Sequence, residues 1–193
     1  MRTILSLAVL LALPGCPKSP PAAAPAAAPA PPAEQEVPVT PRHGAEAFFT
    51  NLAVGGGSFN HDGTQLLIHT DATGVFNVYA QPVAGGEPTA LTHSTDDGRY
   101  AVSWFPADDR FLSQGDQGGN ELLHVFVHEL DGTVVDVAPG EHRSLFVGWS
   151  GDRTAFYVAT TERDPKVMDL YRHTLEEGYP RTMVLQNPGT FDI

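Results

Sequence analysis

The sequence predicts an all-β fold for the residues from 44 onward. Short apolar or alternating segments are separated by Gly, Asp, Asn and Pro, and no window keeps a helical period for more than a turn or two. Three aromatic residues that precede aspartate-containing turns, Phe59, Trp104 and Trp149, follow one another at intervals of 45 residues. Each interval holds four short strand-like segments, which is typical of a β-propeller blade.

Each repeat is expected to contribute four antiparallel strands in chain order. The expected strands are 57–59, 65–69, 75–79 and 89–91, then 100–105, 110–114, 121–129 and 134–137, and finally 144–149, 154–159, 168–173 and 181–185. The blades then cover about 52–95, 98–140 and 143–188. Because propellers close with about four to eight blades, we expect residues 44–193 to be a partial propeller. Such an incomplete ring belongs to a longer protein or assembles with other blades.

Residues 1–15 are interpreted as a lipoprotein signal peptide. Arg2 precedes an apolar segment, 4–13, that is shorter than the roughly 20 residues of a membrane-spanning helix. The segment ends in Leu-Pro-Gly-Cys, which resembles the lipobox of bacterial lipoproteins and marks Cys16 as the acylated residue. Pro17 follows instead of aspartate, which by the same resemblance favours the outer membrane of the cell envelope. The alternative is an ordinary secretory signal that leaves Cys16, the only cysteine, as an unpaired thiol.

Residues 16–43 are predicted to be a disordered tether. Nine prolines and eight alanines occupy positions 17–41, so this segment buries too little apolar surface to offset the entropy of ordering. The whole chain has a formal net charge of −12 and no cluster of Lys or Arg. This charge argues against nucleic acid and anionic lipid surfaces as partners. The expected membrane contact is therefore the lipid on Cys16.

Ser150 is a candidate nucleophile by its local sequence. The sequence Gly-Trp-Ser-Gly at 148–151 is one residue out of register with the Gly-x-Ser-x-Gly elbow of many hydrolases. Ser150 occupies the same position in its repeat as Asn60 and Phe105 do in theirs. We therefore predict that Ser150 is a turn residue, and we assign no catalytic residue in this chain.

Two groups of residues contain side chains that can bind metals. His124 and His128 have the four-residue spacing that brings ligands together on a helix, but on a strand they lie about 13 Å apart. The acidic residues at 96–97, 108–109 and 116 do not follow the spacing of an EF-hand loop, and aspartates in turns commonly bind their own backbone. No metal and no cofactor are therefore expected.

The connections between the second and third strands of each repeat are polar. They cover 71–74, 116–121 and 161–166, and the repeated strand order should place all three on one face of the propeller. This arrangement predicts a rim that contacts a peptide or a partner domain. The alternative is that these connections are solvated hairpin tips. The candidate contact residues are Asp116, Asn120, Glu121, Arg163 and Asp164.

Two longer runs resemble consecutive blades of the prolyl oligopeptidase family of serine peptidases. They are WFPADDRFLSQGDQGGNELLHVFVHELDG and GWSGDRTAFYVATTERDPKVMDLYRHTL, in which Gly-Gly-Asn-Glu and Arg-Asp-Pro…Asp-Leu-Tyr occur in the family's order. The resemblance covers nearly all of residues 55–190. The first-repeat run FNHDGTQLLIHTDATGVFNVYAQPVAGGEPTALT is also similar to the TolB-type propeller of the cell envelope.

The resemblance to prolyl oligopeptidases implies a guard propeller that restricts entry of peptide substrates to an α/β-hydrolase domain with a Ser-His-Asp triad. No Gly-x-Ser-x-Gly occurs in the chain, so the resemblance implies a propeller truncated before the catalytic domain and not catalytic as given. The alternative is a non-enzymatic, TolB-like envelope propeller that acts as a protein-binding module. Both hypotheses place the mature protein in a bacterial cell envelope.

Overall fold

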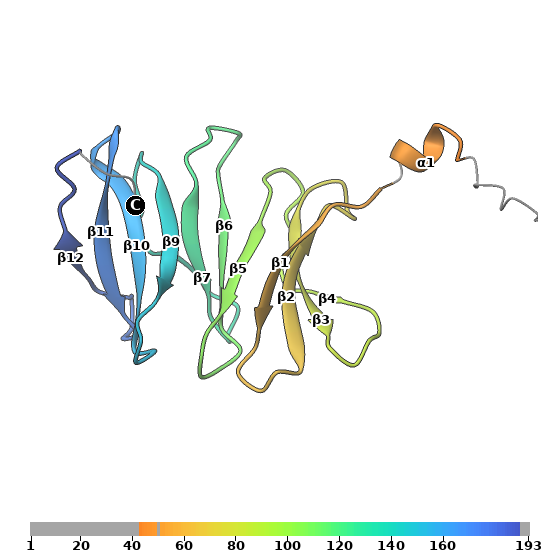
Figure 1. Ribbon diagram of the computed structural model, residues 1–193, viewed down its shortest axis with the longest axis horizontal. Helices are drawn as coiled ribbons and strands as arrows, with labels where there is room; N and C mark the ends of the chain where they lie inside the picture. The colour runs from red at the N-terminus through yellow and green to blue at the C-terminus, as the bar shows by residue number, and fades with distance from the viewer. Residues whose placement is uncertain (1–42, 50, 190–193) are drawn as a thin grey trace, which may run out of the picture. The chain divides into compact units, whose positions relative to one another are not determined.

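The computed structural model describes residues 43–49 and 51–189 and consists of three four-stranded antiparallel sheets (Figure 1). The predicted all-β, propeller-like fold class is confirmed. Within each sheet the strands pair in chain order. The first sheet holds β1 (Val54–Phe59), β2 (Gln65–Thr70), β3 (Asn77–Pro82) and β4 (Thr89–Ala90). The second holds β5 (Tyr100–Trp104), β6 (Phe111–Gly115), β7 (His124–His128) and β8 (Val134–Asp136). The third holds β9 (Ser144–Trp149), β10 (Ala155–Asp164), β11 (Val167–Thr174) and β12 (Arg181–Leu185).

A short helix, α1 (Glu46–Phe49), precedes the sheets. Among the residues that the structure describes, no helix is long and apolar enough to cross a membrane. Cys16 and the predicted signal peptide and tether lie outside the described residues, apart from His43 at the end of the tether.

The repeat of 45 residues is reproduced in the backbone hydrogen bonds. Each turn after an inner strand is closed by an amide that donates to the carbonyl five residues later: Asn60 to Gln65, Phe105 to Arg110, and Ser150 to Ala155. In each inner strand the pairing register also shifts at one residue, and these bulges fall at Gly57, Val102 and Val147. A bulge bends the strand that carries it. The three sheets are thus copies of one unit in hydrogen bonding as well as in sequence.

Ser150 lies in the turn between β9 and β10, as its repeat position predicts. Its hydroxyl donates to Asp152 Oδ1 at 2.6 Å and accepts the Ala155 amide at 3.0 Å. In the first repeat Asn60 Oδ1 accepts the equivalent amide, from Gln65, at 2.9 Å. Hydrogen bonds from Ser150 and Thr154 lower the pKa of Asp152 to about 2. Ser150 therefore closes a turn.

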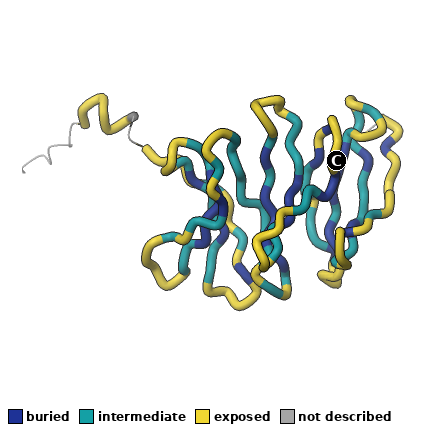
Figure 2. Tube along the Cα trace, turned by 180° about the vertical axis from the view of Figure 1, so that it is seen from behind, coloured by how far each residue is buried: buried dark blue, intermediate teal, exposed yellow. Residues whose placement is uncertain are grey.

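The hydrophobic core lies in two clusters between neighbouring sheets. In Figure 2 the buried residues follow the strands and the exposed residues gather at the connections. The first cluster joins the first and second sheets through Leu67, Val78, Ala80, Trp104 and Phe111. The second cluster joins the second and third sheets through Phe105, Leu112, Val125, Val127, Val137, Phe156, Val158 and Tyr179.

The three repeated aromatic anchors have different environments. Trp104 is buried, with 5% of its surface exposed, and contacts Phe111 edge to face at 5.7 Å between ring centroids. Trp149 is partly buried, and its indole Nε1 donates to Ser103 Oγ at 2.9 Å. Phe59 is 61% exposed. The sequence repeat therefore fixes the position of an anchor in its strand, but not its burial.

The third sheet departs from the predicted strand lengths. Residues 161–166, expected as a loop, continue β10 as far as Asp164, and β11 begins at Val167. Asp164 Oδ1 accepts the Lys166 amide at 2.9 Å and tightens the turn. The connection between β10 and β11 is therefore a short hairpin turn.

Candidate functional site

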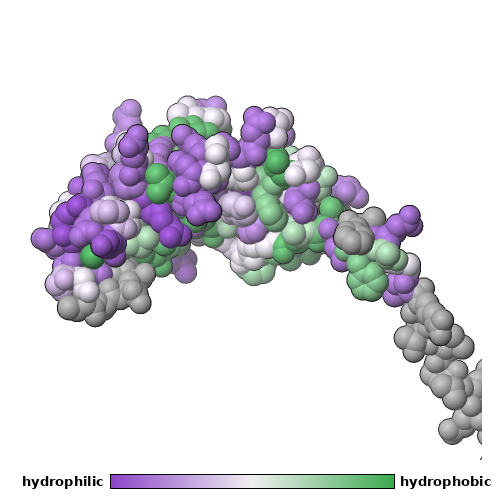
Figure 3. Space-filling model, turned by 90° about the horizontal axis from the view of Figure 1, so that it is seen from above, coloured by the Kyte–Doolittle hydropathy of each residue, from purple (hydrophilic) through white to green (hydrophobic). Residues whose placement is uncertain are grey.

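The three polar connections lie at one edge of the row of sheets, which is the upper edge in Figure 1. They join β2 to β3, β6 to β7 and β10 to β11. Figure 3 views this edge from above and shows hydrophilic side chains over much of it. The predicted contact residues lie in or next to the second and third of these connections.

Asp116, Asn120 and Glu121 lie together in the connection between β6 and β7. Asp116 Oδ2 accepts the Glu121 amide at 3.0 Å, and Asn120 Oδ1 accepts the Leu122 amide at 2.9 Å. Glu121 has a φ of 61°, an uncommon value for a residue with a side chain. The side chains of Asp116 and Asn120 thus form hydrogen bonds within the loop. The Glu121 side chain is exposed and negatively charged.

Arg163 and Asp164 lie in the third sheet and have structural contacts of their own. Arg163 donates to both oxygens of the buried Asp169, at 2.6 and 2.9 Å, and to the Asn187 carbonyl at 2.9 Å. Hydrogen bonds from Arg163 lower the pKa of Asp169. The Arg-Asp-Pro…Asp-Leu-Tyr motif therefore holds the end of β10 against β11.

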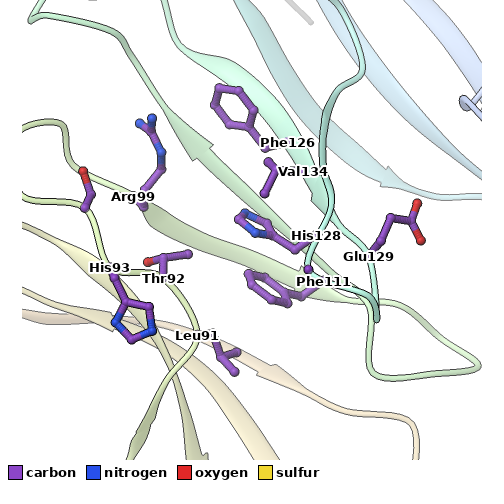
Figure 4. Close-up of a pocket in the computed structure, with 11 residues that line it drawn as sticks. Leu91, Thr92, His93, Arg99, Phe111, Phe126, His128, Glu129 and Val134 are labelled. Carbon is purple, nitrogen blue, oxygen red and sulfur yellow. The ribbon is translucent and has the colours of Figure 1, made fainter.

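A pocket of about 470 Å³ lies between the first and second sheets, close to the connection that holds Asp116 (Figure 4). We call it the Arg99 pocket. One side is formed by the chain after β4 and by Arg99, and the other side by β6, β7 and β8. Its lining consists of Leu91, Thr92, His93, Ser94, Arg99, Phe111, Phe126, His128, Glu129, Gly132 and Val134.

Buried Asn77 holds the first-sheet side of the Arg99 pocket in place. Its Oδ1 accepts the Thr92 hydroxyl at 2.9 Å and the Ser94 amide at 2.8 Å, and its Nδ2 donates to the Ser94 carbonyl at 2.9 Å. The Thr92 hydroxyl in turn accepts the Val78 amide at 2.8 Å. This wall is therefore fixed by hydrogen bonds to a strand, which gives the pocket a preformed shape.

The opposite wall is a stack of two rings. The rings of Phe111 and His128 are nearly parallel, with 4.1 Å between centroids and an interplanar angle of 6°. His128 Nε2 lies 2.8 Å from Ser113 Oγ. Burial and the nearby charge of Arg99 lower the pKa of His128 to about 4, so the imidazole is neutral at pH 7. This wall therefore presents an uncharged, mainly apolar face.

Arg99 provides the positive charge of the pocket. Its Nη1 donates to the carbonyls of Gly98 at 3.2 Å and Asp116 at 3.1 Å, and its Cζ lies 5.1 Å from the Phe126 ring centroid. Within residues 43–49 and 51–189 the Arg99 guanidinium forms no ion pair, and its Nε and Nη2 have no hydrogen-bond acceptor. The guanidinium is therefore half-buried, oriented and still able to bind an anion.

Glu129, the carboxylate in the lining, is engaged on the far side. Its Oε1 accepts the Tyr179 hydroxyl, and its Oε2 lies 3.9 Å from Arg110 Nη1. In Figure 4 its carboxylate points away from Arg99. The Glu129 carboxylate therefore forms no ion pair with Arg99 among the described residues.

The third sheet repeats the ring stack but covers it. Phe156 and His173, each 45 residues after Phe111 and His128, stack with 5.0 Å between centroids and an angle of 8°. Tyr179 lies 5.9 Å from Phe156, and its carbonyl accepts a hydrogen bond from His173 Nδ1 at 3.1 Å. Tyr179 belongs to the connection between β11 and β12, which is longer than the one between β7 and β8. The stack in the second sheet lacks this cover and faces the Arg99 pocket.

Sequence reasoning missed the Arg99 pocket. Its one signal is a break in the repeat, because Val54 and Ser144 stand 45 residues before and after Arg99. Asp116, predicted as a contact residue, contributes through its backbone carbonyl, which orients Arg99. Among the described residues no group of three or more His, Cys, Asp or Glu side chains is arranged to hold a metal ion.

The sheets and their regular order define a propeller-type fold, and comparison with solved structures agrees. The chain is similar to a protein assigned as TolB from Agrobacterium tumefaciens, with a TM-score of 0.55 and 20% identity over 67% of this chain and 45% of that one. It is similar to TolB from Acinetobacter baumannii, with a TM-score of 0.52 and 14% identity over 68% of this chain and 32% of that one. It is also similar to an oligogalacturonate lyase solved in complex with manganese, with a TM-score of 0.50 and 19% identity over 69% of this chain and 41% of that one.

These likenesses establish the fold and leave the function open. The chain spans less than half the length of each of the three proteins. No protein-family profile matches the sequence, and no curated protein matches it. The prolyl oligopeptidase resemblance thus has no family-level match, and the distant structural similarity is to TolB and lyase propellers.

Proposed function

We propose that this chain is a β-propeller binding module of a bacterial cell envelope, with a peptide or a segment of another protein as its ligand. The observation that carries the proposal is the Arg99 pocket, a preformed cavity whose Arg99 end lies beside the polar connection between β6 and β7. The structural likeness to TolB supports the same class of protein. This is the TolB-like alternative derived from the sequence.

The guard-propeller hypothesis rests on sequence motifs that have structural roles here. Arg163 and Asp169 form an ion pair inside the third sheet, and Asp116 and Asn120 hold the loop that contains Gly-Gly-Asn-Glu. These contacts explain the motifs without a hydrolase domain. These motifs therefore give no separate support to the guard-propeller hypothesis.

Site-specific photocrosslinking in the native envelope tests the proposal. A photoreactive residue replaces Gln117, in the connection between β6 and β7, or Arg153, in the exposed turn between β9 and β10 at the opposite edge. We expect one defined protein adduct from position 117 and none from position 153. If neither position gives an adduct, or if both give the same one, the chain does not bind a partner at this edge.

We further propose that lipid on Cys16 holds the module on a membrane. Several acyl chains on one cysteine give stable anchoring, because each buried methylene contributes about 0.8 kcal/mol. Cys16→Ser should move the chain from the membrane fraction to the soluble fraction and abolish labelling with radioactive palmitate. Ser19→Ala is the matched control and should change neither. Full membrane retention of the Cys16→Ser chain would contradict the anchor.

A further inference from the structure

Two cavities between neighbouring sheets each contain an arginine, and the two guanidinium groups differ in their hydrogen-bond partners. The pocket between the second and third sheets contains Arg110, whose guanidinium donates to both carboxylate oxygens of Asp108 and to the Tyr179 hydroxyl. That guanidinium is therefore bound by a carboxylate of its own turn and by a hydroxyl from the third sheet. Arg99 instead uses Nη1 for two backbone carbonyls and leaves Nε and Nη2 without acceptors.

The orientation of Arg99 is fixed before any ligand binds. Its backbone amide donates to the Phe76 carbonyl at 2.8 Å, and its guanidinium is held by the Asp116 carbonyl and packs over Phe126. A guanidinium fixed in this way loses little side-chain entropy when it binds an anion. In a chain of net charge −12, an arginine without a carboxylate partner inside a cavity is a specific feature and not part of a general positive surface.

The rest of the lining limits the ligand to a small apolar group next to an anion. Leu91, Phe111, Phe126 and Val134 provide apolar surface on several sides. The imidazole of His128 is neutral at pH 7 and adds no second positive charge. A single guanidinium beside apolar walls suits one carboxylate, because carboxylates bind guanidinium in a planar, two-bonded geometry.

We infer that the Arg99 pocket binds the C-terminal carboxylate of a peptide whose last side chain is apolar. A chain terminus carries its carboxylate and its last side chain on the same carbon, so both fit a pocket of about 470 Å³ that has its charge at one side. An internal Asp or Glu carries its carboxylate at the end of its own side chain, so a second residue would have to supply the apolar group. This inference rests on the proposed binding function and names the ligand of the same site.

Three matched peptides test the ligand chemistry on the full chain by calorimetric titration. They are N-acetyl-Ala-Leu with a free carboxylate, N-acetyl-Ala-Leu-amide, and N-acetyl-Asp-Leu-amide. We expect the free acid to bind about tenfold or more tightly than either amide, since a charge-assisted hydrogen-bond pair is lost. Equal binding of the free acid and its amide would overturn the carboxylate. Binding of the Asp-containing amide as tight as that of the free acid would overturn the assignment to a C-terminus.

Variants of the chain test the residues. Arg99→Gln should abolish the preference for the free acid, and Arg99→Lys should retain a reduced preference because it keeps the charge without the planar fork. Arg143→Gln, on an exposed arginine, is the control and should bind like the parent. Val134→Phe should weaken binding of the free acid by filling the pocket while Arg99 stays intact. Near-ultraviolet circular dichroism checks the fold of each variant, and Val134→Phe gives a second result if Arg99→Gln does not fold.

The titrations and the crosslinking experiment separate the two proposals. If the folded parent chain binds no peptide but still gives the adduct from position 117, the proposed ligand of the Arg99 pocket is wrong. The proposed binding module then remains supported. If the peptide binds but no position gives an adduct, the proposed protein partner in the envelope is wrong. The proposed carboxylate ligand of the Arg99 pocket then remains supported. An Arg99→Gln chain that keeps the full preference for the free acid would overturn the inference directly.

Discussion

Two histidines in equivalent positions of the second and third sheets have strongly lowered pKa values. His128 and His173 stack on Phe111 and Phe156, and burial lowers the pKa of each to about 4. His173 is fully buried, and His128 also feels the charge of Arg99. Both imidazoles are therefore neutral in the folded protein at pH values where an unfolded chain binds protons.

This difference predicts an acid-dependent loss of stability. The unfolded histidines take up protons below about pH 6.5, while the folded ones stay neutral until about pH 4, so the free energy of unfolding falls as the pH falls through this interval. Each histidine contributes a slope of about 1.4 kcal/mol per pH unit there. His128→Gln should therefore reduce the slope by about this amount in urea denaturation between pH 6 and 5. His43→Gln, at an exposed histidine, is the control. Equal slopes in the parent chain, His128→Gln and His43→Gln would show that His128 is protonated in the folded protein between pH 6 and 5.

At the scale of the strand, the sequence repeat predicts where a residue lies in its strand but not how much its side chain contributes to stability. Trp104 and Phe59 both end inner strands, yet Trp104 packs in the core between two sheets and Phe59 is exposed. The reason is that no described strand packs over Phe59, while Leu67 and Phe111 belong to the cluster around Trp104.

We expect Trp104→Ala to lower the free energy of unfolding by about 3–5 kcal/mol, because it empties a buried site. Phe59→Ala should change it by less than about 0.5 kcal/mol, as is usual for an exposed side chain. Chemical denaturation of the two variants beside the parent chain measures both values. Similar losses in the two variants would mean that Phe59 is covered in solution.

At the scale of the whole described fold, the second sheet joins the two hydrophobic clusters. Side chains of neighbouring strand residues point to opposite faces. Trp104 and Phe111 accordingly face the first sheet, and the adjacent Phe105 and Leu112 face the third. Disrupting either cluster therefore disturbs the sheet that also supports the other.

This shared sheet predicts cooperative unfolding of all three sheets. Trp149→Phe leaves Trp104 as a reporter of the first cluster, and Trp104→Phe leaves Trp149 as a reporter of the second. In each variant the denaturation curve from tryptophan fluorescence should coincide with the curve from far-ultraviolet circular dichroism. A fluorescence transition at clearly lower denaturant in one variant only would mean that one outer sheet unfolds independently.

The sequence by itself determined the strand order, the repeat of 45 residues and the role of Ser150. These features depend on contacts within one repeat: alternation along a strand, hairpins between neighbours in the chain, and turns closed by hydrogen bonds over a few residues. The polar connection that suggested a contact role for Arg163 was also visible in the sequence. The ion pair of Arg163 with Asp169, within the β10–β11 hairpin, was not.

Only the tertiary structure decided which repeated positions are buried and where a ligand fits. The Arg99 pocket needs a wall from the first sheet, held by Asn77, and a wall from the second, formed by Phe111 and His128. The same ring stack is covered by Tyr179 in the third sheet, whereas the second sheet has the smaller Val134 at the position 45 residues earlier. Contacts between sheets join residues that are far apart in the chain, so neither periodicity nor motif spacing specifies them.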